Sequence, residues 1–83
     1  MENYKIKIRA FFTHYFPYAD IQDDDDIFSL GFTNSLIEMQ LLLFLQKNFA
    51  IKLADEDKTI ENLRTIDAIA ALVERKQTTI LPS

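Results

Sequence analysis

The sequence predicts an all-α protein, a small four-helix bundle with three longer helices, one short helix and a long loop between the first two. Apolar residues recur at helical spacing, few segments alternate apolar with polar residues, and the chain contains only one glycine and two prolines. The 83 residues provide one domain. A domain of this size buries about 60–65% of the surface that its unfolded chain exposes, so we expect one core and no spacious internal pocket.

The N-terminal segment predicts a first helix that ends near Pro17. Its apolar residues lie at helical spacing, at Tyr4, Ile8, Phe11, Phe12 and Tyr15. From 17 to 34 this pattern is lost, and four consecutive aspartates precede an apolar cluster around Gly31. We interpret this segment as a long loop with its own apolar anchors, which are Ile27, Phe28, Leu30 and Phe32. Loops of this length are uncommon in compact domains and are often functional.

Residues 35 to 50 are apolar around most of a helical circumference, so this second helix is expected to be the most buried. Residues 51–59 form a connector, after which Ile60 and Leu63 can anchor one short helical turn. The spacing of Ile66, Ile69, Ala70 and Val73 then predicts a last helix, with Thr65 as N-cap and with Arg75 and Lys76 suited to its C-terminal dipole. We expect a domain over 1–77 and a flexible tail over 78–83.

Composition limits the classes of function. The formal net charge is −4 and no block of lysines or arginines occurs, so nucleic acid is not an expected partner, whereas basic protein patches are. The chain has no cysteine, and any thiol chemistry therefore needs an imported thiol. The N-terminus lacks a signal-peptide pattern, and the densest apolar run, Leu41 to Leu45, is far shorter than the ~20 residues that span a bilayer. We therefore expect a cytoplasmic protein without a membrane partner.

Two possible sites have weak support in the sequence. The single His14 cannot build a histidine metal cluster, so a structural or surface role is expected. A calcium loop starting at Asp26 would place Gly31 correctly at position six. However, positions three, five and twelve would be Phe28, Leu30 and Ile37, which offer no carboxylate. We expect no metal site, and we interpret the aspartates as a solvated loop that also repels wrong partners.

Ser35 lies where the long loop meets the second helix, and its position fits two roles. With Glu38 it can form a capping box, in which the serine hydroxyl accepts a hydrogen bond from the Glu38 amide and the Glu38 carboxylate bonds back. The same place suits a serine phosphodiester, because the free amides and the positive dipole end of a helix favour an anion. Both roles share one geometry, so local physics leaves the choice open.

The string DIFSLGFTNSL at 26–36 resembles the motif of acyl carrier proteins, written D-x-F-x-x-L-G-x-D-S-L, with slightly different spacing. The resemblance extends through Phe49, Ile51 and the helix at 66–73, and covers nearly the whole chain. It implies a bundle of acyl-carrier type in which Ser35 carries 4′-phosphopantetheine, attached by a separate phosphopantetheinyl transferase that uses coenzyme A. A carrier of this kind needs no catalytic residue of its own, because partner enzymes act on the acyl thioester of the arm.

The chain departs from the motif at Asn34, where most carriers have aspartate, and this bears on which transferase accepts it. The segments L-G-F-x-N-S-L and DAIAALVER at 67–75 look like those of discrete carriers for oxygenated polyketide extender units, such as hydroxymalonyl or methoxymalonyl groups. This likeness implies glyceryl-type cargo, acyl-loading and acyl-modifying enzymes, and a polyketide synthase acyltransferase as partners of a monomeric carrier. The expected partner-binding residues are Asn34, Leu36, Glu38, Met39, Asp55, Glu56 and Glu61.

Three alternatives stay open at this stage. The chain could be a peptidyl or other discrete carrier, or a helical interaction module that docks through its apolar loop and acidic face with Ser35 only as a cap. A hydrolase that uses Ser35 has less support, because no general base is evident and Ser35 has no Gly-x-Ser-x-Gly setting.

Overall fold

The chain folds into four α-helices and one 3-10 turn in a computed structural model that describes residues 2–31 and 34–79. In chain order the elements are α1 (Glu2–Tyr15), α2 (Ser35–Phe49), η1 (Asp55–Asp57), α3 (Ile60–Leu63) and α4 (Ile66–Thr79). No strand occurs in these two ranges. The predicted small helical bundle is therefore confirmed. Of the two expected anchors of α3, Leu63 is buried, whereas Ile60 is 56% exposed, so the expectation for Ile60 is wrong.

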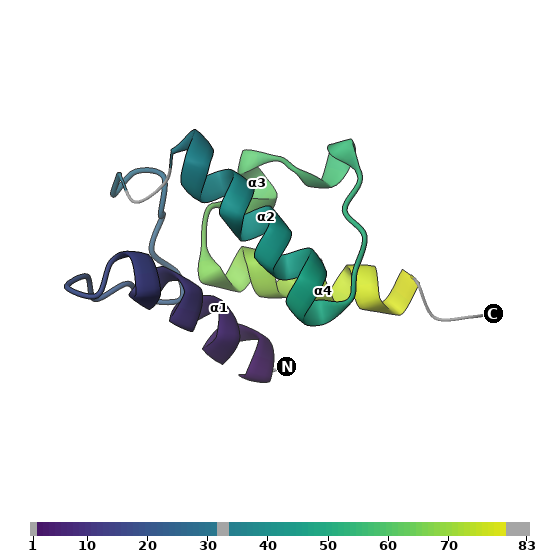
Figure 1. Cartoon of the computed structure of the whole chain (residues 1–83), viewed down its shortest axis with the longest axis horizontal. Helices are drawn as coiled ribbons and strands as arrows, with labels where there is room; N and C mark the ends of the chain where they lie inside the picture. The colour runs from purple at the N-terminus through teal and green to yellow at the C-terminus, as the bar shows by residue number, and fades with distance from the viewer. Residues whose placement is uncertain (1, 32–33, 80–83) are drawn as a thin grey trace.

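Helix α4 is the centre of the bundle, because it contacts α1, α2 and α3 (Figure 1). It buries the largest set of side chains, Ile66, Ile69, Ala70, Leu72 and Val73. Helix α2 buries only one stripe, Ile37, Leu41, Leu45 and Phe49. The prediction that α2 is the most buried helix is therefore wrong. Its apolar circumference exceeds the surface that its neighbours cover, so Leu36, Met39 and Leu43 remain 63%, 58% and 54% exposed.

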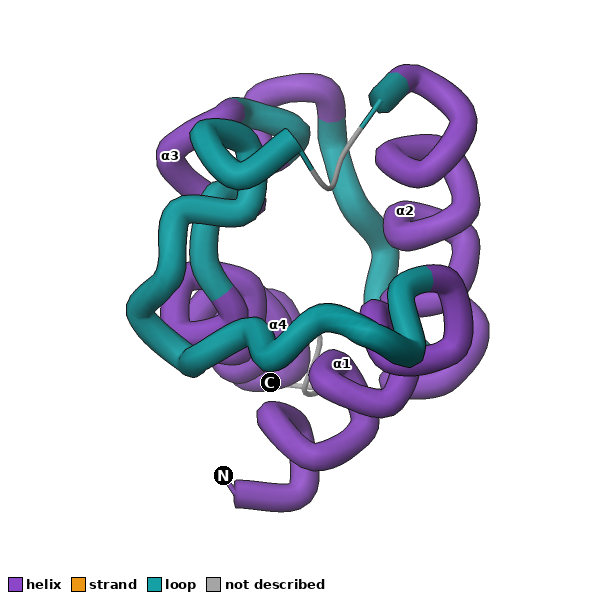
Figure 2. The backbone as a smooth tube through the Cα atoms, turned by 90° about the vertical axis from the view of Figure 1, so that its left-hand side faces the viewer, coloured by secondary structure: helices purple, strands orange, loops and turns teal. Residues whose placement is uncertain are grey.

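The long loop from 16 to 34 is fastened to the bundle by apolar and polar contacts. Ile21 and Ile27 are buried in the core, Phe28 packs against it, and Leu30 is 50% exposed. The expected anchor Phe32 lies outside the described residues. Figure 2 shows the loop passing from the end of α1 to α3 before it reaches α2. The backbone amide of Ile27 donates to the carbonyl of Arg64 at 2.7 Å, which joins the loop to the end of α3.

Two of the four loop aspartates form ion pairs with the helices. Asp23 pairs with Arg9 and lies 3.9 Å from the Lys5 ammonium, and its carbonyl accepts from the Asp67 amide at 3.0 Å. Asp26 pairs with Arg64 at 2.7 Å. Both side chains remain partly exposed, so the ion pairs with α1 and with the end of α3 add to the interpretation of the aspartates as a solvated loop and do not overturn it.

The end of the domain differs slightly from the expected boundary. The Thr65 hydroxyl accepts from the Ala68 amide at 2.9 Å, which confirms Thr65 as the cap of α4. Helix α4 continues to Thr79, two residues beyond the expected boundary at 77. Residues 80–83 of the predicted tail lie outside the described part of the chain. Lys76 pairs with Asp57 at 2.8 Å, so it also joins α4 to η1.

Candidate functional site

The start of α2 is capped by Asn34. Asn34 has an extended backbone, and its side-chain oxygen accepts from the Ile37 amide at 3.0 Å. The Glu38 amide donates to the Asn34 carbonyl at 2.8 Å. The prediction of a capping box between Ser35 and Glu38 is therefore wrong, because the N-cap is Asn34, one residue before Ser35. Because the backbone of Asn34 is extended, its short polar side chain can accept from the Ile37 amide, which has no partner within the helix. Ser35, by contrast, is already the first helical residue.

Ser35 takes no part in the side-chain cap of α2. Ser35 is exposed, and its hydroxyl makes no hydrogen bond to any part of the chain that the structure describes. The first amides of α2 and the positive end of the helix dipole lie beside it, which favours an anionic group at this place. The site therefore offers a free hydroxyl in surroundings that would stabilise its phosphate ester.

A surface groove of about 380 Å³ begins at Ser35 and follows α2. Its lining residues are Ser35, Glu38, Met39, Leu42, Leu43, Gln46 and Lys58. The spacing of those on α2 places them on one helical face. Lys58 comes from the segment between η1 and α3, which runs back alongside α2 (Figure 1). The groove is thus bounded by α2 and by the connector.

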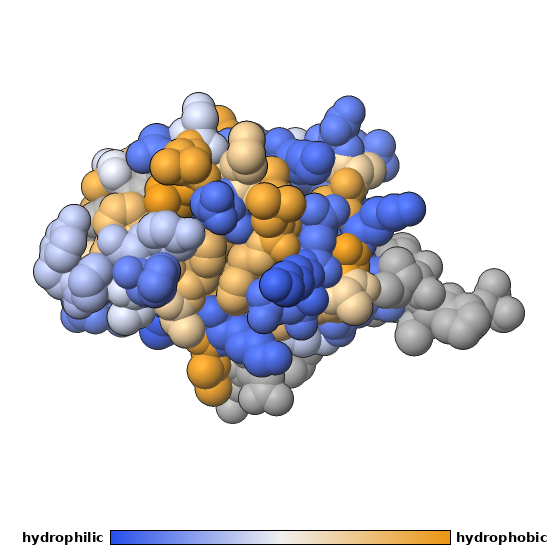
Figure 3. All heavy atoms as spheres, viewed as in Figure 1, coloured by the Kyte–Doolittle hydropathy of each residue, from blue (hydrophilic) through white to orange (hydrophobic). Residues whose placement is uncertain are grey.

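The predicted partner residues divide into two groups. Glu38 and Met39 share the groove with Ser35, and the exposed Asn34 and Leu36 flank Ser35 in the chain. Figure 3 shows apolar side chains along α2 and in the band between α2 and α1. The other group, Asp55, Glu56 and Glu61, is exposed on η1 and α3 and does not line the groove.

The connector is held in place by residues that sequence reasoning missed. The Asp57 carboxylate pairs with Lys76 at 2.8 Å and accepts from the Ala54 amide at 2.9 Å. The Lys76 bond, followed by the Ala54 bond, lowers the pKa of Asp57 below its ordinary value of 3.8. The side chain of Gln46 accepts from the Leu53 amide at 3.1 Å, which ties α2 to the connector. Only the D-E-D turn composition hints at such a cap, since Lys76 is distant in sequence.

The motif residues before Ser35 shape the loop. The Asp26 carboxylate accepts from the backbone amides of Phe28 and Ser29 at 3.2 and 3.3 Å, and its bond with Arg64 is the main cause that lowers the pKa of Asp26. Gly31 has a φ of +78°, a conformation that residues with a Cβ rarely adopt. Asp26 and Gly31 thus set the path of the loop that leads towards α2.

No histidine is among the residues that line the groove at Ser35. His14 is exposed and packs against Tyr15, with ring centroids 5.0 Å apart, and it does not line the groove at Ser35. Within 2–31 and 34–79 no three histidine, aspartate or glutamate side chains gather closely enough to hold a metal ion. None of the helices described there has the length and apolar character to cross a membrane. The chain matches no protein-family model, no curated protein and no solved structure.

Proposed function

We propose that this chain is an acyl carrier protein whose 4′-phosphopantetheine arm is attached to Ser35. The observation that carries this proposal is the free, exposed hydroxyl of Ser35 at the start of α2, where Asn34 performs the capping that a structural serine would provide. The resemblance of residues 26–36 to the acyl carrier motif supports the same residue. Other enzymes act on such a carrier, and the carrier itself supplies no catalytic residue.

The surroundings of Ser35 suit such an arm. The bound arm supplies a thiol that holds an acyl group as a thioester, and the chain itself has no cysteine. The first turn of α2 would stabilise the phosphodiester, and Lys58, whose ammonium lies 3.8 Å from the Asp55 carboxylate, lines the same groove. The groove is open to solvent along α2, so its walls give little enclosed apolar space for a long acyl chain. This fits a small polar cargo.

The partners in this proposal are a phosphopantetheinyl transferase, acyl-loading and acyl-modifying enzymes, and a polyketide synthase acyltransferase, all meeting a monomeric carrier in the cytoplasm. Glu38 in the groove and the exposed Asp55, Glu56 and Glu61 offer carboxylates to basic patches on these enzymes. The cargo is a glyceryl or related oxygenated three-carbon unit, as the likeness to extender-unit carriers implies.

The attachment is tested by incubating the protein with coenzyme A and a promiscuous phosphopantetheinyl transferase, followed by measurement of the intact mass. We expect one phosphopantetheine on the wild type and none on Ser35→Ala. Ser29→Ala is the matched control, because Ser29 is also an exposed serine and lies in the loop that precedes α2. Loading of Ser35→Ala at the wild-type rate would overturn the assignment.

The cargo is tested separately, by offering the holo protein to enzymes that transfer three-carbon, long-chain or amino-acid groups. We expect loading with a glyceryl-type thioester. Efficient loading with long fatty acyl groups and none with three-carbon units would contradict this cargo, and amino-acid loading would favour a peptidyl carrier.

A second candidate function is a helical interaction module without an arm. The exposed Leu36, Met39 and Leu43 on α2 favour it, because three large apolar side chains along one helix commonly mark an interface. A wild-type protein that no transferase modifies, but whose partner binding is lost in Met39→Asp, would support the module and contradict the carrier.

A further inference from the structure

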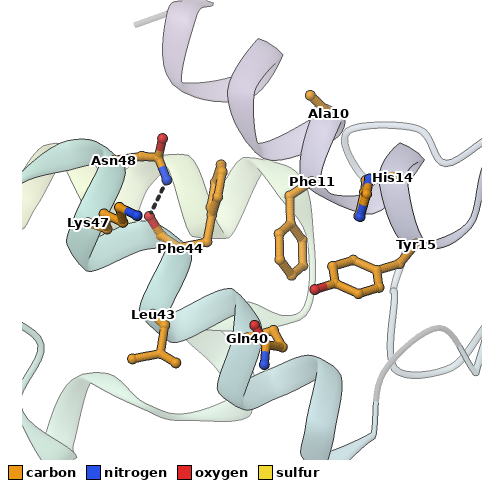
Figure 4. Close-up of a pocket in the computed structure, with 9 residues that line it drawn as sticks. All are labelled: Ala10, Phe11, His14, Tyr15, Gln40, Leu43, Phe44, Lys47 and Asn48. Carbon is orange, nitrogen blue, oxygen red and sulfur yellow. Dashed lines mark hydrogen bonds between the residues drawn. The ribbon is translucent and has the colours of Figure 1, made fainter.

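A second surface groove, of about 720 Å³, lies between α1 and α2, and no part of the proposed carrier function uses it. Its lining residues are Ala10, Phe11, His14, Tyr15, Gln40, Leu43, Phe44, Lys47 and Asn48 (Figure 4). Leu43 lines both grooves and forms the wall between them. The volume falls within the ~300–1,000 Å³ that is usual for sites of small organic ligands.

Four rings form a continuous row along this groove. The ring centroids of Phe44 and Phe11 are 5.1 Å apart, those of Phe11 and Tyr15 are 4.9 Å apart, and those of Tyr15 and His14 are 5.0 Å apart. Tyr15 is 37% exposed and Phe44 is half-buried, whereas Phe11 is only 8% exposed, so a ligand would contact mainly Tyr15 and Phe44. Rings of this kind attract a further aromatic ring in offset or edge-to-face geometry.

The polar residues that line the groove include no acidic side chain, although the protein as a whole carries a net negative charge. The chain carries 13 aspartates and glutamates, yet none of the nine lining residues is acidic. Lys47 lies one helical turn from Phe44, and the structure assigns its ammonium no ion pair with any described residue. Figure 4 shows Lys47 and Asn48 at one end of the row of rings and His14 at the other. Lys47 also suits the C-terminal dipole of α2, but that role leaves its charge available.

We propose that the groove between α1 and α2 binds a small aromatic carboxylate, with its ring on the row of Phe44, Phe11 and Tyr15 and its carboxylate at Lys47. Ring contacts hold the apolar body, and the absence of acidic lining residues removes repulsion of the anion. The site needs no arm on Ser35. It therefore stands independently of the carrier function.

The test is a two-dimensional NMR titration of the full chain with 2-naphthoate. We expect saturable shifts of backbone amides confined to residues 10–15 and 40–48. Lys47→Gln should weaken binding about two- to fivefold, which is the range of an exposed ion pair. Lys52→Gln is the matched control, because Lys52 is exposed and lies outside both grooves. The neutral 2-naphthamide should bind more weakly than 2-naphthoate, and Ser35→Ala should bind 2-naphthoate like the wild type.

Three results would overturn this proposal. The first is the lack of saturable binding, which would leave the groove to a protein partner. The second is a set of shifts centred on the groove at Ser35 instead of the row of rings. The third is equal binding by Lys47→Gln and Lys52→Gln, since the charge complementarity would then have no effect. Because the amide spectrum also reports the fold of each variant, an unfolded Lys47→Gln would be recognised. The comparison of 2-naphthoate with the neutral 2-naphthamide on the wild type would then test the charge complementarity, and equal binding of the two would overturn it.

Discussion

Replacement of Asn34 by alanine should destabilise the fold, because Asn34 supplies the only side-chain cap at the start of α2 in the described structure. Its side-chain oxygen accepts from the Ile37 amide at 3.0 Å, and alanine would leave that amide to solvent. Loss of such a cap costs about 1 kcal/mol, within a range of about 0.5–2 kcal/mol. In a domain of this size a loss of about 1 kcal/mol lowers the melting temperature by about 4–8 °C.

The neighbouring substitution Ser35→Ala should have little effect on stability. The Ser35 hydroxyl makes no hydrogen bond to the described residues, and alanine is the better helix former, so the unfolding free energy should stay within about 0.5 kcal/mol of the wild type. Urea unfolding followed by far-ultraviolet circular dichroism measures both variants. Asn34→Asp is the control, because aspartate caps as well as asparagine does.

The reasoning would be refuted if Ser35→Ala lost about 1 kcal/mol while Asn34→Ala did not. That pattern would return the cap to Ser35 and would remove the observation that carries the proposed function. A loss of about 1 kcal/mol of unfolding free energy in both variants would equally contradict a Ser35 hydroxyl without a structural role.

Three further predictions concern other parts of the molecule. Ala50→Gly should raise the unfolding free energy by up to about 1 kcal/mol in urea, because Ala50 ends α2 with a φ of +54°, where glycine is favoured; an unchanged or lower value would contradict this. Asp57→Asn should be less stable than the wild type at pH 7, and the difference should narrow as the pH falls below 3.8 and through the lowered pKa of Asp57; thermal unfolding at several pH values would contradict this if the difference were constant. Glu38→Lys should slow transferase loading at low salt more than Glu38→Gln does, and wild-type loading should slow as salt rises, since charges beyond ~8 Å are screened at physiological ionic strength. Equal rates at all salt concentrations would move recognition to apolar contacts of Leu36 and Met39 and of Phe32, which lies outside the described residues.

Periodicity was enough to predict the helices. The stripe at Ile66, Ile69 and Val73 predicts both the position of α4 and its buried face, because an amphipathic helix packs its single apolar face against the core. Thr65 fixes its start through a local hydrogen bond. Such features depend on residues a few positions apart, which sequence displays directly.

Burial and long-range pairing could not be predicted in the same way. Leu36 and Leu41 are alike in sequence, but only Leu41 faces the bundle. The pairing of Asp26 with Arg64 joins residues 38 positions apart, which no local pattern reveals. At the candidate site, Asn34 and Ser35 are both good capping residues, so the backbone conformation decides which one caps.

Peptide-level mass spectrometry after transferase treatment tests most directly whether the Ser35 hydroxyl carries the phosphopantetheine arm. Trypsin releases residues 10–47 as one peptide, which contains Ser35 together with the hydroxyls of Thr13, Ser29 and Thr33 and the phenolic hydroxyls of Tyr15 and Tyr18. Fragmentation of this peptide distinguishes among them. We predict a single phosphopantetheine on Ser35 in the wild type and an unmodified peptide from Ser35→Ala. Modification at another hydroxyl, or none on a folded wild-type protein under conditions that load an established carrier, would contradict the account.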